Sequence, residues 1–446
     1  MLDRTKKLTA LLLALLLAAP MTACGNEQGS TPDTDTPPAP VTTEAPETGI
    51  VQTNGSLTLM DGDTSLFTII RAEDAPKYEI EAAQAFSAGI EKSSGGKRLD
   101  MGTDYLKKGE EADPAALEIL IGNTNRPESK ALIESLPEKT FGIRTTDTKI
   151  VIAAADPINL ARAVESFFSS APLTLDETTG RLSLNLEMDH ISQPYDYFAE
   201  IIPTADTLSS TVEKLLTVKV PDDKSKTVQG GYTDGKYHYQ AFIAKDTASN
   251  EQNNVDIIVK TDLTTGEVVK TSGPLALNHA NDLTYNAKID KLVVVHNNPN
   301  RTKVSYVDPE TLELTETKTI PYSIYSMEYN ESRDQYVVGL SGGQSFTLLD
   351  GNLERISGVK AAKPTVRTNG YTTQGVTADD NYIYFVLYNQ NVITVYDWDF
   401  NFVTLIEMDL GKVEPENLSI VGNDLYVVST GGGAAIWRVT PVAKTN

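Results

Sequence analysis

The second half of the chain repeats a polar residue at the start of each of several short predicted strands. Amides, a hydroxyl and carboxylates in this position form hydrogen bonds with sugar hydroxyls, and a nearby tyrosine ring provides a face for stacking. The ligand-binding candidates on these strands and in the loops beside them are Gln229, His279, Asn281, Asp282, Ser326, Gln374, Tyr388, Glu416 and Asn417. The alternative is that these polar side chains only hydrogen-bond to one another.

Three carboxylates on the same strands offer a second chemistry. Glycoside hydrolysis needs two carboxyl groups beside the scissile bond, about 5 Å apart for retention or about 6.5–9.5 Å apart for inversion. The candidates are Asp282, Glu328 and Glu416. Because side chains alternate along a strand, the different offsets of Asp282 and Glu328 within the repeat need not point the two side chains the same way. We therefore expect a non-enzymatic binding protein, and a glycosidase or lyase is the alternative.

Histidine and cysteine are too scarce to indicate a metal site. The chain has 4 histidines, none with HExxH or HxH spacing, and 1 cysteine. A disulfide framework and cysteine-based zinc or iron–sulfur sites are therefore excluded. The glycine-rich turns at 342–343 and 431–433 are not followed by Lys-Ser/Thr, as a phosphate loop requires. We expect no metal and no cofactor.

The repeat that carries the candidate residues is typical of a β-propeller. Its units start 52, 45, 48 and 42 residues apart, and each contains a polar turn, an apolar strand, a third strand and an outer strand. Four strands per unit of this length form one propeller blade. We predict a five-bladed β-propeller over residues 205–446. The last unit lacks a fourth strand, which residues 215–220 are predicted to supply, closing the ring and protecting its edges.

The third strand of most units ends in aspartate. A side chain of this kind accepts hydrogen bonds from the backbone of a tight turn. The residues concerned are Asp262, Asp308, Asp350 and Asp397. We predict that they form turns.

Residues 55–204 predict a separate α+β domain. Apolar strands are expected at 66–71 and 117–122 and a hairpin at 141–153, while three-to-four spacing of apolar residues predicts helices at 79–92 and 159–168. A further short helix is expected at 127–135. The pattern indicates a small α+β sandwich, a mixed sheet with helices on one face.

One segment of this domain resembles a known family. Between Glu118 and Ser129, a strand ending in Gly122 leads through an Asn/Thr-rich turn into a helix. This run resembles the small α+β domain that precedes the catalytic barrel in β-hexosaminidases and α-glucuronidases. The resemblance implies a glycan-related context and an accessory domain without catalytic residues of its own.

The N-terminus has the pattern of a lipoprotein signal peptide over residues 1–23. Basic residues precede an apolar run of about twelve residues, which is too short for a permanent span, and small residues then precede Cys24. Acylation of Cys24 would anchor the chain firmly. Residues 24–54, rich in Thr, Pro and Glu, predict a disordered tether. The alternative is an ordinary secretory signal with an incidental cysteine.

Charge and anchor together indicate the compartment and the partners. The formal net charge of -23 excludes nucleic acid, whose phosphates the chain could not neutralise. We expect a protein lipid-anchored to the extracytoplasmic face of a bacterial cell membrane. Its expected partners are that membrane and a glycan, a cell-wall polymer or a cell-envelope protein.

Overall fold

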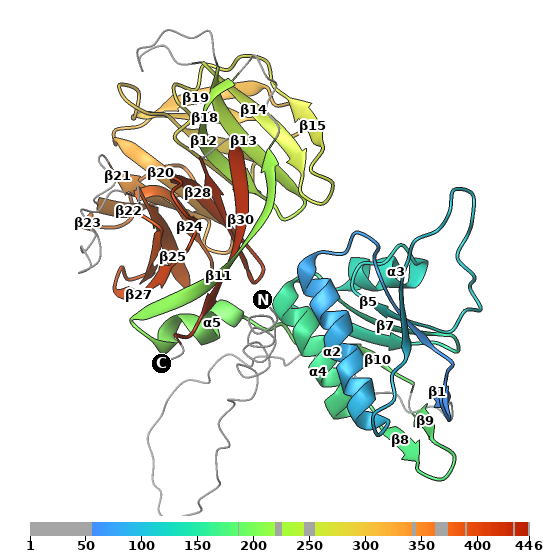
Figure 1. Ribbon diagram of the computed structural model, residues 1–446. Coiled ribbons are helices and arrows are strands. Elements are labelled where there is room, and N and C mark those ends of the chain that lie inside the picture. The colour runs from blue at the N-terminus through green and yellow to red at the C-terminus, as the bar shows by residue number, and fades with distance from the viewer. Residues whose placement is uncertain are drawn as a thin grey trace, which may run out of the picture. The chain divides into compact units, whose positions relative to one another are not determined.

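The computed structural model describes residues 56–185, 187–218, 225–244, 255–340, 345–361, 373–388, 390–430 and 433–444 (Figure 1). The chain divides into two compact units at Tyr195 and Asp196. Cys24 and the predicted signal peptide and tether lie outside the described residues. Within the described residues, no helix combines the length and the apolar character that crossing a membrane requires.

The first unit is built on a mixed six-stranded sheet. Its strand order is β10 (Asp189–Ile191), β6 (Phe141–Thr145), β7 (Lys149–Ala154), β5 (Glu118–Ile121), β3 (Thr68–Arg71) and β4 (Asp100–Thr103). The strands β7, β5, β3 and β4 are parallel, whereas β6 and β10 are antiparallel to their neighbours. A smaller antiparallel sheet has the order β2 (Thr64–Ser65), β1 (Leu57–Asp61), β9 (Arg181–Leu184) and β8 (Leu173–Asp176).

Helices cover both faces of the six-stranded sheet. Helices α2 (Lys77–Ser93) and α4 (Pro157–Ser170) pack on the face that carries Ile119, in one cluster with Phe86 and Phe167. Helix α3 (Pro127–Ser135) places Leu132 against Leu120 on the opposite face. The prediction of helices on one face is therefore wrong. The physical reason is visible in β5, whose consecutive apolar residues are all buried, as is typical of a strand covered on both sides.

The second unit consists of four β-sheets, in which every strand pairing except that of β11 with β27 is antiparallel. Three of them are four-stranded: β12 (Ser225–Thr233), β13 (Tyr237–Ala244), β14 (Asp256–Asp262) and β15 (Val268–Thr271); β16 (Asp282–Asn286), β17 (Lys291–Val295), β18 (Lys303–Val307) and β19 (Leu314–Thr319); and β20 (Ile324–Asn330), β21 (Gln335–Leu340), β22 (Ser345–Asp350) and β23 (Lys360–Ala361). The fourth has the order β24 (Thr373–Ala378), β25 (Tyr382–Leu387), β26 (Val392–Asp397), β27 (Phe402–Glu407), β11 (Thr207–Val218), β30 (Ala434–Val442), β29 (Asp424–Ser429) and β28 (Pro415–Val421).

The inner strands form a closed ring. Strands β12, β16, β20, β24 and β28 contact one another in this order, and β28 also contacts β12. Apolar side chains fill the space between neighbouring sheets: Val293 packs with Met327, and Val228 with Val428. Sheets arranged around a ring of inner strands define a β-propeller, so this unit is a β-propeller domain.

Strand β11 precedes the first sheet in sequence but pairs with the last strand. It is antiparallel to β30 from Ser209 opposite Val442 to Val218 opposite Ala434. At its start, Thr207 and Leu208 also pair in parallel with β27. The helix α5 (Tyr197–Ile201) and a 3-10 turn (Ile202–Thr204) lead into it.

The strand-terminal aspartates form the turns predicted for them. In the first three units, the carboxylate accepts from the backbone N–H two residues later, at 2.9 Å for Asp262, 3.0 Å for Asp308 and 2.9 Å for Asp350. Asp397 accepts from the N–H of Asn401 at 2.7 Å. The turn prediction is confirmed at these positions.

Candidate functional site

A β-bulge recurs near the start of three consecutive inner strands, and β12 also has a register shift, between Val228 and Gly231. The pairing of β20 with β21, of β24 with β25 and of β28 with β29 each skips one residue near the start of the inner strand. The skipped residues are Tyr325, Gln374 and Glu416. A bulge leaves its extra residue out of the ladder and re-aims its side chain, and bulges are frequent beside functional sites. The repetition gives three consecutive sheets a re-aimed polar side chain at one end of the ring.

The bulge corrects the alignment made from the sequence, which matched Ser326 with Gln374 and Glu416. In the structure Tyr325 holds the equivalent position, and Ser326 pairs with Gly339 and is fully buried. Tyr325 was missed because the sequence alignment used the polar residue that starts each strand. Alignment on the following apolar residue, Met327 in this strand, would have found it.

The polar residues of four inner strands form one chain of hydrogen bonds. Asn281, just before β16, donates from Nδ2 to the backbone oxygen of Tyr325 at 2.6 Å. The Tyr325 hydroxyl donates to Oε1 of Gln374 at 3.4 Å, and Nε2 of Gln374 donates to Oε2 of Glu416 at 2.7 Å. Asn297 holds Asn281 in place by donating to its Oδ1 at 2.9 Å. The structure thus brings together three of the candidates predicted from sequence and adds Tyr325.

The surroundings of this chain favour neutral hydrogen-bonding groups. Burial raises the pKa of Glu416 to about 8, the hydrogen bond from Gln374 lowers it, and the charge of Glu414 raises it further. Burial also raises the pKa of Tyr325, while the Arg301 guanidinium, 5.0 Å from the centre of its ring, lowers it. Tyr388 lies close enough to Tyr325 to affect that pKa and is 42% exposed. Near neutral pH, Glu416 is therefore protonated and able to donate a hydrogen bond.

Asp282 and Asn417 lie deeper in the ring and are fully buried. The Asp282 carboxylate accepts from the backbone N–H groups of Leu283 and Met327, each at 2.9 Å, and from the Asn417 side-chain amide. Burial raises the pKa of Asp282 well above its usual value. Met327 and Asn417 lie on other inner strands than Asp282, so these two hydrogen bonds hold the ring together from inside.

Glu328 also lies in the interior. It is 8% exposed, accepts from the Thr377 hydroxyl at 3.4 Å and is hydrogen-bonded by Thr284, and burial raises its pKa to about 8. Its charge raises the pKa of Asp282, so these two carboxyl groups are neighbours. Both carboxyl groups are buried and hydrogen-bonded to other residues of the ring. Within the described residues, no group of three or more His, Cys, Asp or Glu side chains is arranged to hold a metal ion.

The two remaining candidates do not join the chain of hydrogen bonds. Gln229 is 5% exposed, and its Nε2 donates to the backbone oxygen of Val228 at 2.5 Å. His279 has a φ of 79°, between two other residues with positive φ, and its backbone N–H donates to Asp256 Oδ2 at 3.0 Å. These two residues therefore shape the rim around β12 and β16.

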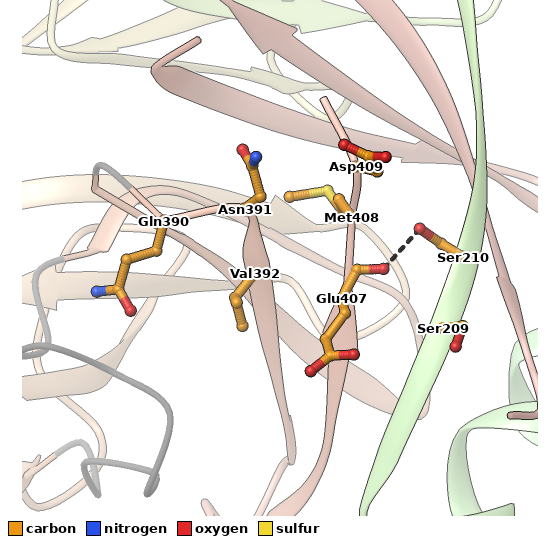
Figure 2. Close-up of a pocket in the computed structure, with 8 residues that line it drawn as sticks. All are labelled: Ser209, Ser210, Gln390, Asn391, Val392, Glu407, Met408 and Asp409. Atoms are coloured by element: carbon orange, nitrogen blue, oxygen red, sulfur yellow. Dashed lines mark hydrogen bonds between the residues drawn. The ribbon is translucent and has the colours of Figure 1, made fainter. Parts of the chain in front are cut away.

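Two cavities lie beside β11, the ends of β26 and β27, and the segment that leads from β27 to β28. The first, of about 570 Å³, is lined by Ser209 and Ser210 of β11 and by residues 390–392 and 407–409. Figure 2 shows Ser210 facing the end of β27, where its hydroxyl donates to the Glu407 backbone oxygen at 2.8 Å. The second, of about 530 Å³, is lined by Asn391, residues 411–414 and Thr430. Both hollows are open to solvent rather than enclosed.

Sequence reasoning missed these cavities for a topological reason. Ser209 and Glu407 are far apart in the chain and meet only because β11 lies between β27 and β30. The missing fourth strand of the last unit indicated that residues 215–220 close the ring, but the repeat pattern gave no signal that the start of β11 would also meet β27.

No protein-family model and no curated protein matches this chain. Among solved structures, glutaminyl cyclase from Myxococcus xanthus aligns with 54% of this chain and 99% of its own, with 9% identity and a TM-score of 0.41. The β-propeller domain of Cps50 (Swd1) from Myceliophteria thermophila aligns with 52% of this chain and 100% of its own, with 11% identity and a TM-score of 0.33. At these scores the alignments say nothing about activity, and the propeller assignment rests on the strand order.

Proposed function

We propose that the chain is a membrane-anchored, non-enzymatic lipoprotein that binds a glycan at the mouth of a five-bladed β-propeller. The observation that carries this proposal is the repeated bulge, which aims Tyr325, Gln374 and Glu416 into one hydrogen-bonded chain.

The five-blade count follows from treating each inner strand as the start of a blade. The eight-stranded sheet then divides between β27 and β11, and β11 becomes the outer strand of the last blade. Pairing the two ends of the domain in one blade closes the ring and leaves no open edge there.

The mouth offers the chemistry that a sugar needs. The partly exposed Gln374 can both donate and accept hydrogen bonds, which matches the dual character of sugar hydroxyls, and Glu416, 5% exposed, fixes the orientation of the Gln374 amide. Tyr388 is 42% exposed and adds an aromatic ring close to that of Tyr325. Arg301, placed over the Tyr325 ring, holds that side chain in position.

The location of this binding activity follows from the N-terminal pattern. A lipid on Cys24 would hold the chain at the extracytoplasmic face of a bacterial membrane. The first unit would be the accessory α+β domain that the Glu118–Ser129 resemblance implies. Replacement of Cys24 by serine should release the chain from the membrane fraction, whereas continued anchoring of the variant would contradict lipidation.

The alternative, a glycosidase or lyase, receives less support. Asp282 is fully buried and Glu328 is 8% exposed, and both are hydrogen-bonded within the ring. Acid–base catalysis requires groups that reach the substrate. Turnover of a bound glycan that is lost in Glu328→Gln would reverse this preference.

The test of binding is a glycan array probed with the full chain, isolated from membranes in detergent. We expect bound glycans to be lost in Gln374→Ala and Tyr388→Ala, while the thermal stability is unchanged. Tyr105, 63% exposed in the first unit, provides the matched control Tyr105→Ala. Absence of glycan binding, together with capture of a cell-envelope protein that depends on Gln374, would overturn the glycan proposal in favour of a protein partner.

A further inference from the structure

The two cavities and the mouth are neighbours. Glu414 lines the second cavity and directly precedes β28, two residues before Glu416. Asn391 then lines both cavities. A path of polar side chains therefore leads from the inner strands, over the β27–β28 connection, to β11 at the outside of the ring.

Asn391 is the lining residue that the two cavities share. Its Nδ2 donates to the backbone oxygen of Gly411 at 2.9 Å, and its own backbone oxygen accepts from the Met408 N–H at 2.9 Å. These bonds fix the loops before β26 and after β27 against each other. The two hollows that share Asn391 are of similar size, about 570 and 530 Å³.

Building on the proposed function, we propose that the ligand is a linear, uncharged polysaccharide that extends from the mouth across both cavities to β11. A single sugar would use only the mouth, whereas two cavities that share Asn391 as a lining residue suit consecutive residues of a chain. The walls supply hydroxyls from Ser209 and Thr430, amides from Gln390 and Asn391 and a carboxylate from Asp409, and these groups together both donate and accept hydrogen bonds.

The charges select against an acidic polymer. In the lining, Glu407 is paired with Lys444 at 2.8 Å, which leaves the carboxylates of Asp409 and Glu414 with the single lysine Lys412. The whole chain carries a net charge of -23. The carboxylates of a uronic acid chain would therefore be repelled by these side chains, whereas an uncharged polysaccharide would not be repelled.

The test measures affinity against chain length. The full chain in detergent is titrated with linear oligomers of glucose, xylose, mannose and N-acetylglucosamine, from one to eight units, and with galacturonic acid oligomers. We expect affinity for one uncharged series to rise with length beyond the disaccharide and then level off. Asp409→Ala combined with Ser209→Ala should weaken the longest oligomers about tenfold, the effect of one good hydrogen bond, and leave the disaccharide unchanged.

Asp399→Ala is the control, because Asp399 is an exposed carboxylate in the turn at the other end of β26. If affinity does not depend on oligomer length and is unchanged in the variant that combines Asp409→Ala with Ser209→Ala, the extended site is overturned. The proposal of binding at the mouth then still stands. No binding at any length would overturn the proposed function itself. Equal or tighter binding of galacturonic acid oligomers would overturn the uncharged ligand, and binding of extended peptides with the same loss in the Asp409 variant would assign the path to a protein.

Discussion

The Asn417 side-chain amide donates a hydrogen bond to the Asp282 carboxylate, which connects β28 to β16 past the strand β12 that lies between them. The approach is possible because β12 presents Gly230 at this level. A methyl group on Gly230 would lie 2.6 Å from the Asp282 Cα. The ring is thus small enough for one side-chain pair to reach across an intervening strand.

Loss of the Asp282 carboxylate should destabilise the propeller. In Asp282→Ala, the Met327 N–H and the Asn417 amide lose a buried acceptor, and we expect a cost on the order of 3 kcal/mol. Hydrogen exchange of the β16 and β28 amides measures it. Combination with Asn417→Ala should cost less than the sum of the two single variants, because they share one interaction. Strict additivity would show that the pair does not couple.

Close packing of inner strands should make Gly375 intolerant of a side chain. A Cβ at this position would lie 2.8 Å from the Asn417 Cα, and backbone cannot move aside as a flexible side chain can. Gly375→Ala should therefore cost about 1–3 kcal/mol of propeller stability, measured by denaturant unfolding. Gly273→Ala is the control, since nothing lies within 4 Å of its added Cβ. Equal stability of the two variants would contradict the close approach.

The buried ion pair of the first unit should be sensitive to loss of one partner. Arg126 and Glu118 are 2.9 Å apart with side chains 7% and 8% exposed, and Lys149 is 3.4 Å from the same carboxylate. Arg126→Ala leaves the buried Glu118 carboxylate with one positively charged neighbour fewer. We therefore expect the free energy of unfolding of the first unit to fall by about 3–5 kcal/mol. The exposed pair of Arg144 with Asp189 is the control: Arg144→Ala should cost about 0–1 kcal/mol. Hydrogen exchange of β5 distinguishes these outcomes, and similar losses in both variants would refute the argument from burial.

Glu79 should make the first unit less stable as the pH rises. Burial raises its pKa from 4.5 to about 7, so between these pH values the folded chain keeps a proton that the unfolded chain releases. The stability contributed at Glu79 is therefore highest below pH 4.5 and falls until about pH 7, by roughly 3 kcal/mol.

The variant Glu79→Gln cannot lose this proton. Its stability relative to the natural chain should therefore increase by about 3 kcal/mol between pH 4 and pH 8, as measured by hydrogen exchange of β5. The partly exposed Glu81, on the same helix, provides the control Glu81→Gln, for which we expect no comparable pH dependence. A pH-independent difference for Glu79→Gln would show that the side chain is ionised in the folded state.

The bulged residues show where sequence patterns stop being sufficient. Tyr325, Ser326 and Met327 form one alternating run, and nothing in it marks which residue the ladder skips. The register of an inner strand depends on its partner, so one inserted residue moves every earlier side chain to the other face. Local sequence therefore placed Ser326, rather than Tyr325, at the mouth.

The sequence by itself determined the repeat of inner, apolar and outer strands, because β-strand patterning and the turn-forming aspartates at 262, 308, 350 and 397 are local properties. It also determined the helices of the first unit through their three-to-four spacing. Only the tertiary structure decided that α3 covers the second face of the sheet, that Asp282 is buried inside the ring, and that Ser209 meets Glu407 in a cavity. These features arise from contacts between residues distant in the chain, which burial and ring closure select and no local pattern records.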